Sequence, residues 1–421
     1  MSHLSMPVTP PESPIMNVIF IEPCFPDNQR EFARALHAAG AKVIGIGERP
    51  ESYLTDEMRH WLFDYIQIDS VVNEASLLKA VQFVQSKLWV DRLEATIESH
   101  IMAAAKIREA AGIPGTSVRT AFLCRDKPAM KEALREAGIP CAQSTRAESA
   151  EDARAFAKTV GYPLIIKPPD GAGAVGTFRV ASDAELEGVI EESGLAGGLA
   201  VAIEEFIEGH EGYIDTITID GDVQHEFITH YYPNVLEAMR ERWISPQMVT
   251  TNRIDAPGYS EVRQMTCDVI KALDIGTSAT HMEWFFGPKG LKFSEIGCRP
   301  PGVGQWDVYN AANEFDIYYE WASAIVNGRV ASQPSRRYAA GMIALRPDGD
   351  GHISGYSGLD EIGSRYGDCI VKAHLPDPGT PTQGVEAGYM ANAWMRVRHP
   401  DYDELRRILD EIGRTVQVHA Q

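Results

Sequence analysis

The chain has 421 residues, and its 39 Lys and Arg against 59 Asp and Glu give a formal net charge of −20. At about 150 residues per domain, this length predicts two or three domains. The hydrophobic content of 44% is enough for each domain to bury a core. No apolar run approaches the roughly 20 residues that span a bilayer, and the acidic balance argues against binding to nucleic acids or anionic membranes. A small anionic ligand held by a few local cations is still compatible with this charge.

The six cysteines form no C-x-x-C pair and have no zinc-finger spacing. Isolated thiols are typical of a reducing compartment, so we expect a cytoplasmic protein. Residues 1–16 are rich in Pro, Ser and Thr and lack the basic and apolar regions of a signal peptide. We therefore predict a disordered tail there.

Strands and helices alternate from residue 17 onward. Short apolar runs predict strands at 17–22, 42–47, 64–68 and 92–97. Apolar residues at helical spacing predict helices near 29–39, at 74–87 and at 101–111. Such alternation indicates a parallel sheet covered by helices, and we assign it to an N-terminal α/β domain at 17–115.

The next region, 116–330, mixes helices with longer strands. Helices are expected at 127–137, 150–160, 183–192, 259–273 and 307–327, and antiparallel strands at 199–207, 212–220, 223–232 and 281–297. The remaining residues, 331–421, are predicted to be β-rich with a terminal helix at 403–412. The fold class is therefore α/β and α+β multidomain.

A glycine-rich segment follows the strand that ends at Lys167. Gly171, Gly173 and Gly176 are separated by small residues only, which lets backbone N–H groups approach a phosphate while the lysine adds a charge. The spacing fits neither the P-loop nor the dinucleotide-binding motif. A flexible hairpin tip is the alternative interpretation.

Carboxylates surround a second turn. Glu204 and Glu205 end a strand, Ile207 is apolar, and Glu211 begins the next strand. Such a hinge can hold a purine beside apolar side chains, with the carboxylates taking its exocyclic amine and the ribose hydroxyls. An ordinary hairpin with acids on its surface is the alternative.

The hairpin at 281–297 carries Glu283 and Glu295, and its register decides what they can do. A five-residue loop at 287–291 would place the two side chains opposite each other on one face, whereas a four-residue loop would place them on opposite faces. Facing carboxylates repel each other unless a cation lies between them, and Mg²⁺ prefers oxygen ligands. Arg299 follows closely enough to contact a phosphoryl or carboxylate oxygen. An exposed hairpin with solvated charges is the alternative.

Lys127 stands at the start of a predicted helix, where a cation opposes the helix dipole unless it has another task. Binding a substrate phosphate would be such a task, and a solvated lysine beside Asp126 is the alternative.

Taken in order, the segments "RDK", "IIKP", "EEFIEGHE" and "HMEW…SEIGCRPPG" resemble the ATP-grasp superfamily over about residues 17–327. The resemblance implies an ATP-grasp fold with an N-terminal Rossmann-like domain at 17–115, an ATP-grasp domain at 116–330 and a C-terminal β-rich domain at 331–421. The segment at about 140–199 would be a lid.

The resemblance also implies roles for the residues singled out above. Lys127 and Lys167 would contact the ATP phosphates, under the loop of Gly171, Gly173 and Gly176. Glu204, Glu205 and Ile207 would border the adenine, and Glu211 would hold the ribose. Glu283 and Glu295 would bind Mg²⁺, with Mn²⁺ as a substitute, and Arg299 would stabilise the transferred phosphoryl group.

Gly297 stands where many members of the superfamily have Asn, which leaves the number of metal ions open. The pattern E-x-G-x-R is similar to that of carboxylate–amine ligases of the amino-acid and dipeptide ligase type. The resemblance implies that ATP converts a small acid to an acyl phosphate, which an amine then attacks, with release of ADP and phosphate. A homodimer is compatible with this prediction, and the acid and the amine are not identified.

Two alternatives stay open. An ATP-grasp enzyme of the biotin-carboxylase or purine-pathway type would activate bicarbonate or another small carboxylate. A nucleotide-binding regulatory module without activity belongs to a different class, and the retention of both lysines, both metal carboxylates and Arg299 argues against it.

Overall fold

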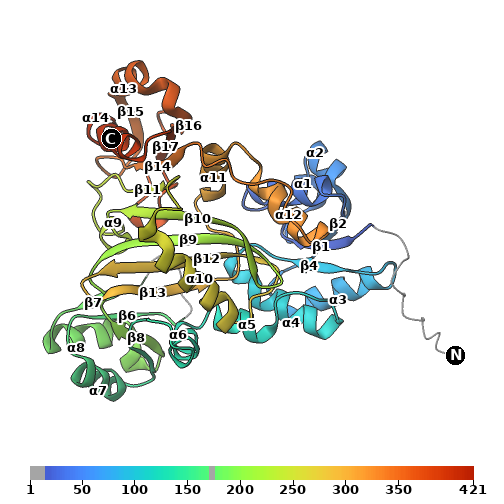
Figure 1. Cartoon of the computed structure of the whole chain (residues 1–421), viewed down its shortest axis with the longest axis horizontal. Helices are drawn as coiled ribbons and strands as arrows, with labels where there is room; N and C mark the ends of the chain where they lie inside the picture. Colours follow the sequence, from blue (N-terminus) through green and yellow to red (C-terminus); the bar gives the residue numbers. More distant parts are fainter. Residues whose placement is uncertain (1–14, 170–175) are drawn as a thin grey trace.

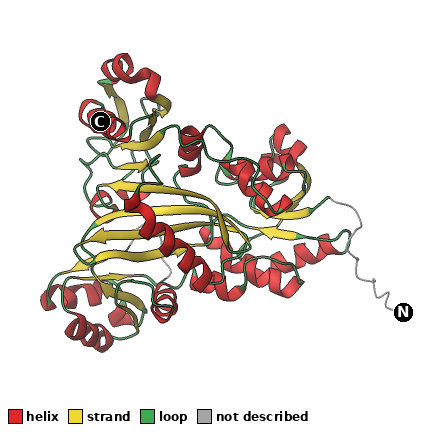
Figure 2. Ribbon diagram, in the orientation of Figure 1, coloured by secondary structure: helices red, strands yellow, loops and turns green. Residues whose placement is uncertain are grey.

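The computed structural model describes residues 15–169 and 176–421. Its strands form a parallel sheet near the N-terminus, a small antiparallel sheet, a large antiparallel sheet and a two-stranded ribbon (Figures 1 and 2). Gly171 and Gly173 of the predicted phosphate loop, and nearly all of the predicted tail, lie outside the described residues.

The N-terminal part contains a four-stranded parallel sheet, which confirms the α/β pattern. Ile19 packs with helices on one face of the sheet, and Phe20 packs with α1 and with α12 of the middle region on the other face. A helix from the middle of the chain thus completes the N-terminal core. In spatial order the strands are β3 (Leu62–Gln67), β2 (Lys42–Gly47), β1 (Asn17–Ile21) and β4 (Arg92–Glu94). The helices are α1 (Gln29–Ala38), α2 (Asp56–Trp61), α3 (Glu74–Gln85), α4 (Ile101–Ala111) and α12 (Ile317–Asn327).

The small antiparallel sheet occupies the region of the predicted lid. Two helices pack against its buried apolar residues, which gives this part a core of its own. In spatial order the strands are β5 (Ser144–Ala147), β8 (Val201–Glu205), β6 (Leu164–Lys167) and β7 (Phe178–Val180), and the helices are α7 (Ala150–Val160) and α8 (Asp183–Glu192). Because β8 is part of the sheet, the sheet extends past residue 199.

Eight antiparallel strands make the large sheet in the centre of the molecule. In spatial order they are β13 (Gly290–Gly297), β12 (Ser278–Gly287), β9 (His210–Ile219), β10 (Asp222–Tyr232), β11 (Gln247–Thr250), β14 (Ala339–Leu345), β17 (Ala393–His399) and β16 (Ile370–His374). The C-terminal part is β-rich, as predicted, but three of its strands extend this sheet instead of forming one of their own. The two-stranded ribbon and two further helices cover the end of the sheet: β15 (Ile353–Ser357), β18 (Gln417–Ala420), α13 (Leu359–Tyr366) and α14 (Tyr402–Thr415).

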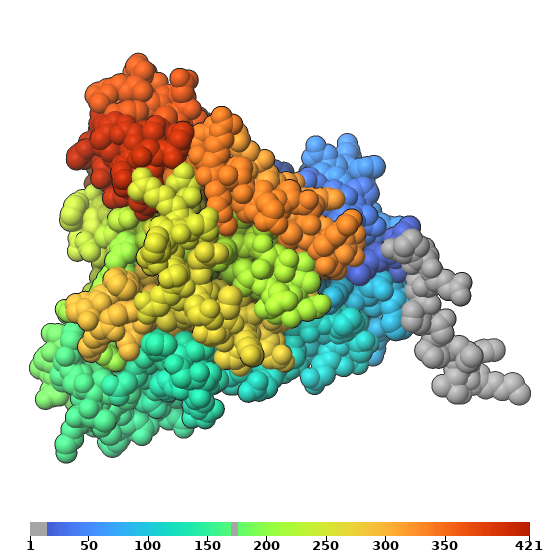
Figure 3. Space-filling model, viewed as in Figure 1, coloured from blue at the N-terminus to red at the C-terminus, as the bar shows by residue number. Residues whose placement is uncertain are grey.

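Figure 3 shows the small sheet (green) and the C-terminal part (red) at opposite ends of one face, with segments of the large sheet between them. The remaining helices are α5 (Val118–Leu123), α6 (Lys127–Glu136), α9 (Val235–Ala238), α10 (Ser260–Ala272) and α11 (Gln305–Asn313). Short 3₁₀ helices lie at Glu51–Tyr53, Glu98–His100, Leu195–Gly197, Pro257–Tyr259, Gly367–Cys369 and Val385–Ala387. In the described part of the chain, none of the helices has the length and apolar character needed to cross a bilayer.

The single helix predicted at 307–327 is wrong, because α11 and α12 are separate. Glu314 has a φ of 55°, a left-handed conformation that ends α11. Asp316 then caps α12 by accepting a hydrogen bond from the Tyr319 N–H. The apolar residues keep their helical spacing across the break, so the apolar pattern alone does not reveal it. The break depends on the Asp316 cap.

The hairpin of β12 and β13 places Glu283 opposite Glu295, but not through the five-residue loop considered above. Gly287 pairs with Gly290, so the turn contains only Pro288 and Lys289. A β-bulge at Ser294 adds one residue to β13 and shifts the register before Glu295. Glu283 and Glu295 therefore face each other, as in the first of the two arrangements considered above, although neither the five-residue nor the four-residue loop occurs.

Phe32 on α1 packs against α12, so its removal measures how much this contact stabilises the N-terminal part. Its ring lies 5.1 Å from that of Trp321, 5.0 Å from that of Tyr318 and 5.1 Å from that of Trp306. Phe32→Ala should lower the free energy of unfolding by about 3–5 kcal/mol, since it leaves a cavity among three aromatic rings. Chemical denaturation measures the change, and Phe83→Ala on the exposed side of α3 should have little effect. Equal losses from both variants would contradict this packing.

Candidate active site

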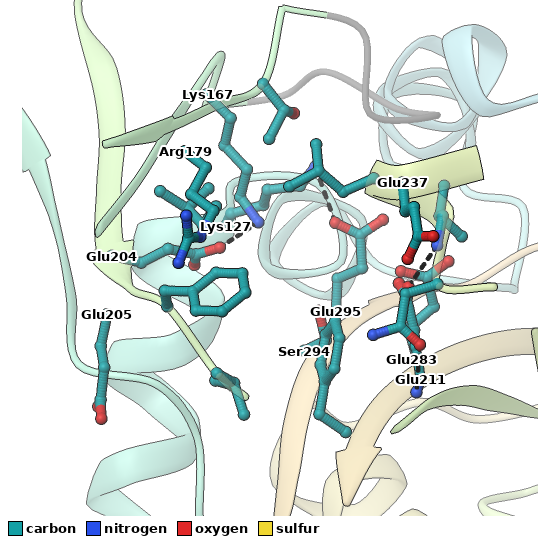
Figure 4. Close-up of a pocket in the computed structure, with 18 of the residues that line it drawn as sticks. Lys127, Lys167, Arg179, Glu204, Glu205, Glu211, Glu237, Glu283, Ser294 and Glu295 are labelled. Atoms are coloured by element: carbon teal, nitrogen blue, oxygen red, sulfur yellow. Dashed lines mark hydrogen bonds and ion pairs between the residues drawn. The ribbon is translucent and has the colours of Figure 1, made fainter. Parts of the chain in front are cut away.

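A cavity of about 430 Å³ lies between the small sheet and the large sheet, and it brings most of the predicted site together. Figure 4 shows Lys167 and Glu204 on one side, Glu211 and Glu283 on the other, and Glu295 between them. The predicted residues that line the cavity are Lys127, Lys167, Glu204, Glu205, Ile207, Glu211, Glu283 and Glu295. Gly176 has a φ of 68° but is not among the lining residues, and Gly171 and Gly173 are outside the described residues.

Glu204 joins two lysines in the wall of the cavity. It forms ion pairs with Lys167, at the end of β6, and with Lys131, on α6. Burial alone would raise the pKa of Glu204, but the two cations outweigh it and lower this pKa to about 2. The sequence analysis missed Lys131, whose side chain is only 1% exposed. Its position one helical turn after Lys127 was the available signal.

Lys127 lies at the first turn of α6, where Asp126 caps the helix by accepting a hydrogen bond from the Ala129 N–H. Its Nζ lies 3.2 Å from Oε2 of Glu295. Burial would raise the pKa of Glu295, but Lys127 and Lys167 together hold it below its usual value. A cation at this helix start is thus compensated by a carboxylate from β13.

Glu211 is buried beside Glu283. The Val235 N–H donates a hydrogen bond to its Oε2 at 2.6 Å, and its own N–H donates to Oδ1 of Asn234 at 3.0 Å. Burial and the charge of Glu283 raise the pKa of Glu211 above its usual value. The segment that begins at Asn234 therefore fixes Glu211 in the wall of the cavity.

Three further polar residues surround Glu283, none of which the sequence analysis named. His281 contacts Oδ1 of Asp215 through Nδ1 at 2.6 Å and Oε1 of Glu283 through Nε2 at 3.6 Å. Burial would lower the pKa of His281, but the two carboxylates outweigh it and raise this pKa to about 9. The Tyr231 hydroxyl donates to the same Oε1 at 3.3 Å. His281 could have been found from the sequence, because side chains two residues apart on a strand point to the same face, as His281 and Glu283 do on β12.

Arg299 does not line the cavity. Its guanidinium forms an ion pair with Glu98, which follows β4, and donates a hydrogen bond to the Pro300 carbonyl at 2.9 Å. Arg125 also lies near Glu98, at 3.9 Å between the charged atoms. The structure thus ties the predicted phosphoryl-binding arginine to the N-terminal part.

Apolar residues also line the cavity. The guanidinium of Arg179 on β7 lies 4.8 Å from the centre of the Phe206 ring, and Ile165 and Ile207 lie nearby in the same wall. Glu204 and Glu205 point in different directions, as successive strand residues must (Figure 4). Glu205 forms an ion pair with Lys289, whereas Glu204 pairs with Lys131 and Lys167. We call Lys127, Lys131, Lys167, Glu204 and Glu295 the lysine cluster.

Comparison with known proteins shows which kind of domain contains this cavity. The family model described as the carbamoyl-phosphate synthase L chain, ATP binding domain, matches residues 126–299, which include every charged residue of the lysine cluster and the β12–β13 hairpin. Residues 126–299 thus match an ATP-binding domain of the ATP-grasp type. An L-arginine-specific L-amino acid ligase of Bacillus subtilis is 29% identical over 252 residues, which cover 58% of this chain and 60% of that relative. The alignment therefore spans less than two thirds of the relative's length.

Solved structures share the ATP-grasp fold over nearly the whole chain. The crystal structure of an L-amino acid ligase from Bacillus licheniformis has a TM-score of 0.76 at 17% identity and covers 96% of this chain and 99% of that one. N5-carboxyaminoimidazole ribonucleotide synthetase from Thermotoga maritima has a TM-score of 0.68 at 17% identity and covers 97% and 100%. At these identities the likeness concerns the fold, and it confirms the predicted architecture.

Lys131 is the most deeply buried lysine of this cavity, and its ion pair is with Glu204. Lys131→Met should lower the free energy of unfolding by up to about 3 kcal/mol, because Glu204 stays buried and keeps only Lys167. Urea denaturation measures the loss. Lys289→Met is the matched control, since its partner is the neighbouring Glu205 and its own side chain is 68% exposed. A control that destabilises as much as Lys131→Met would refute the special role of the buried pair.

Proposed function

We propose that the protein is an ATP-dependent carboxylate–amine ligase, which forms an amide or peptide bond through an acyl phosphate and releases ADP and phosphate. The observation that carries the proposal is the convergence of Lys127, Lys167, Glu283 and Glu295 on one cavity. Lysines at these positions would neutralise phosphate oxygens, and phosphoryl transfer depends mostly on such positioning and electrostatic stabilisation.

ATP would lie along the cavity. Its phosphates would lie beside Lys127 and Lys167, two of the three lysines that line the cavity. Its adenine would lie where Phe206 and Ile207 offer flat and apolar contacts and the backbone can meet the polar edge of the base. Glu211 would take the ribose.

The donor set fits Mg²⁺, or Mn²⁺ as a substitute. Glu283 and Glu295 are directly opposite in register, and hard oxygen ligands of this kind suit a divalent cation that completes its shell with water and phosphate oxygens. Within residues 15–169 and 176–421, no group of three or more His, Cys, Asp and Glu side chains could hold a metal by itself. When bound, the ion would neutralise charge on the phosphates.

The chain's own residues would then serve two chemical steps. In the first, a carboxylate oxygen of the acid attacks the γ-phosphorus of ATP, and ADP leaves with the electrons of the broken bond. Lys127 and Lys167 stabilise the charge on the transferred group. In the second, the amine attacks the acyl carbon, phosphate leaves, and the nitrogen loses a proton. The small sheet, which carries Lys167, would exclude water from the acyl phosphate.

The relatives suggest amino acids as the acid and the amine, since the Bacillus subtilis relative is an L-arginine-specific L-amino acid ligase. An enzyme that activates bicarbonate is the second candidate, because the fold also matches the biotin carboxylase domain of a 2-oxoglutarate carboxylase solved with bicarbonate, over 96% of the chain. A homodimer stays a prediction.

The reaction itself can be tested by its products. A screen of acid and amine pairs should give ADP, and not AMP, only when both substrates are present. Oxygen-18 from the acid's carboxylate should appear in the released phosphate, since the carboxylate oxygen becomes part of the acyl phosphate. AMP with pyrophosphate, or label that stays wholly in the acid, would contradict the mechanism. Turnover that requires bicarbonate would favour the second candidate.

The phosphate contact of Lys167 has a separate test. Lys167→Ala should weaken ATP binding about 10- to 100-fold, because it removes a buried charge beside the phosphates. Glu204 keeps Lys131 in this variant, so Lys167→Ala should destabilise the fold no more than Lys131→Met does. Calorimetry measures the affinity, and Lys158→Ala, at an exposed position on α7, is the control. Unchanged affinity in the Lys167 variant would remove this residue from the site.

A further inference from the structure

We infer that His281, oriented by Asp215, is a positioning residue that presents Glu283 to the divalent cation of the nucleotide site. The inference rests on the proposed metal role of Glu283. It concerns how the carboxylate is held, which neither the fold nor the comparisons assign.

The first observation is that His281 and Tyr231 contact the same oxygen atom of Glu283. Nε2 of His281 lies 3.6 Å from Oε1 of Glu283, and the Tyr231 hydroxyl donates to the same Oε1 at 3.3 Å. Both groups contact one oxygen, so we assign the cation to the other, Oε2. A carboxylate fixed in this way presents a single oxygen in a set direction, as ligands fixed by outer hydrogen bonds do.

The second observation is that His281 is itself held in place. Its Nδ1 lies 2.6 Å from Oδ1 of Asp215, a carboxylate on the adjacent strand, where the two residues are register partners. The Tyr309 hydroxyl donates a hydrogen bond to the second oxygen of Asp215. The Tyr213 ring packs edge-on against the imidazole, 4.8 Å between centroids. The imidazole ring therefore has one orientation, with Nε2 directed at Glu283.

The two metal carboxylates are held by different means. Lys127 contacts Oε2 of Glu295 at 3.2 Å, so Glu295 meets a cation that also faces the proposed phosphates. Glu283 instead meets His281 and Tyr231 from the large sheet. Nucleotide binding can draw Lys127 toward the phosphates, whereas the contacts of Glu283 come from the sheet on which it stands. Glu283 would thus be the fixed ligand of the pair.

Two substitutions separate the contact with Glu283 from the contact with Asp215. In His281→Asn the amide nitrogen lies about as far along the side chain as Nδ1, so it can serve Asp215 but cannot reach Glu283. In His281→Gln the amide nitrogen lies nearer the position of Nε2, so it can reach Glu283. A purely structural role, with Asp215 as the important partner, predicts that the Gln variant is the more damaged one.

The experiment measures Mn²⁺ binding by electron paramagnetic resonance in the presence of ADP, with thermal unfolding of each free variant alongside. We expect His281→Asn to bind Mn²⁺ about 10- to 100-fold more weakly than the wild type, and His281→Gln to keep most of the affinity. Tyr231→Phe should weaken binding by less. His230→Asn is the control, because His230 lies on the opposite face of the sheet and contacts His210 and Tyr259.

Each outcome decides one point. Wild-type affinity in His281→Asn, or an equal loss in the Asn and Gln variants, would overturn the positioning role while leaving the proposed metal site intact. Absence of Mn²⁺ binding by the wild-type protein with ADP would overturn the metal site, and the inference with it.

Discussion

Buried lysines and carboxylates neutralise one another in the cavity, and the candidate site depends on this compensation. Lys131 and Lys167 meet at Glu204, and Lys127 meets Glu295. A buried charge without a partner is strongly destabilising, so these side chains hold each other in place before any ligand arrives. Three lysines share two carboxylates in this cluster. Groups that are already oriented need little rearrangement when charge develops on a phosphoryl group.

The parts of the fold that could be predicted are those whose signals are local. The helix at 150–160 agrees with its prediction at both ends, because Ser149 and Asp152 form a capping box at its start and Gly161 follows its end. The helix at 101–111 ends at Gly112, which has a φ of 67°. By contrast, the break between α11 and α12 depends on Glu314 adopting a left-handed conformation, which its residue type does not favour. The pairing of β11 with β14, about ninety residues apart, leaves no local trace either.

The candidate site was predictable to the same extent. Eight of its residues were found because each stands beside a strand end, a turn or a helix start, and they meet in one cavity. Arg299 could not be placed, because its partner Glu98 is 201 residues away and belongs to the N-terminal part. That ion pair connects the end of the parallel sheet to the strand that carries Glu295. The edge strand β4 of the N-terminal sheet is therefore connected to the hairpin that lines the cavity.

The pairing of Glu283 with Glu295 depends on one inserted residue. From Gly287 and Gly290 up to Trp284 and Phe293, the hairpin follows a single register, and continuing it would place Glu283 opposite Ser294. Glu295 would then stand opposite Met282, with its side chain on the other face of the sheet, which is packed with apolar residues. The bulge at Ser294 returns Glu295 to the face of Glu283, beside Lys127. The two-residue turn makes a tight hairpin, and the bulge changes the face to which the Glu295 side chain points. The geometry of the turn and the position of Glu295 are therefore set by different residues. The cluster of buried lysines can then meet both carboxylates on one surface, where the sheet also supplies His281 and Tyr231.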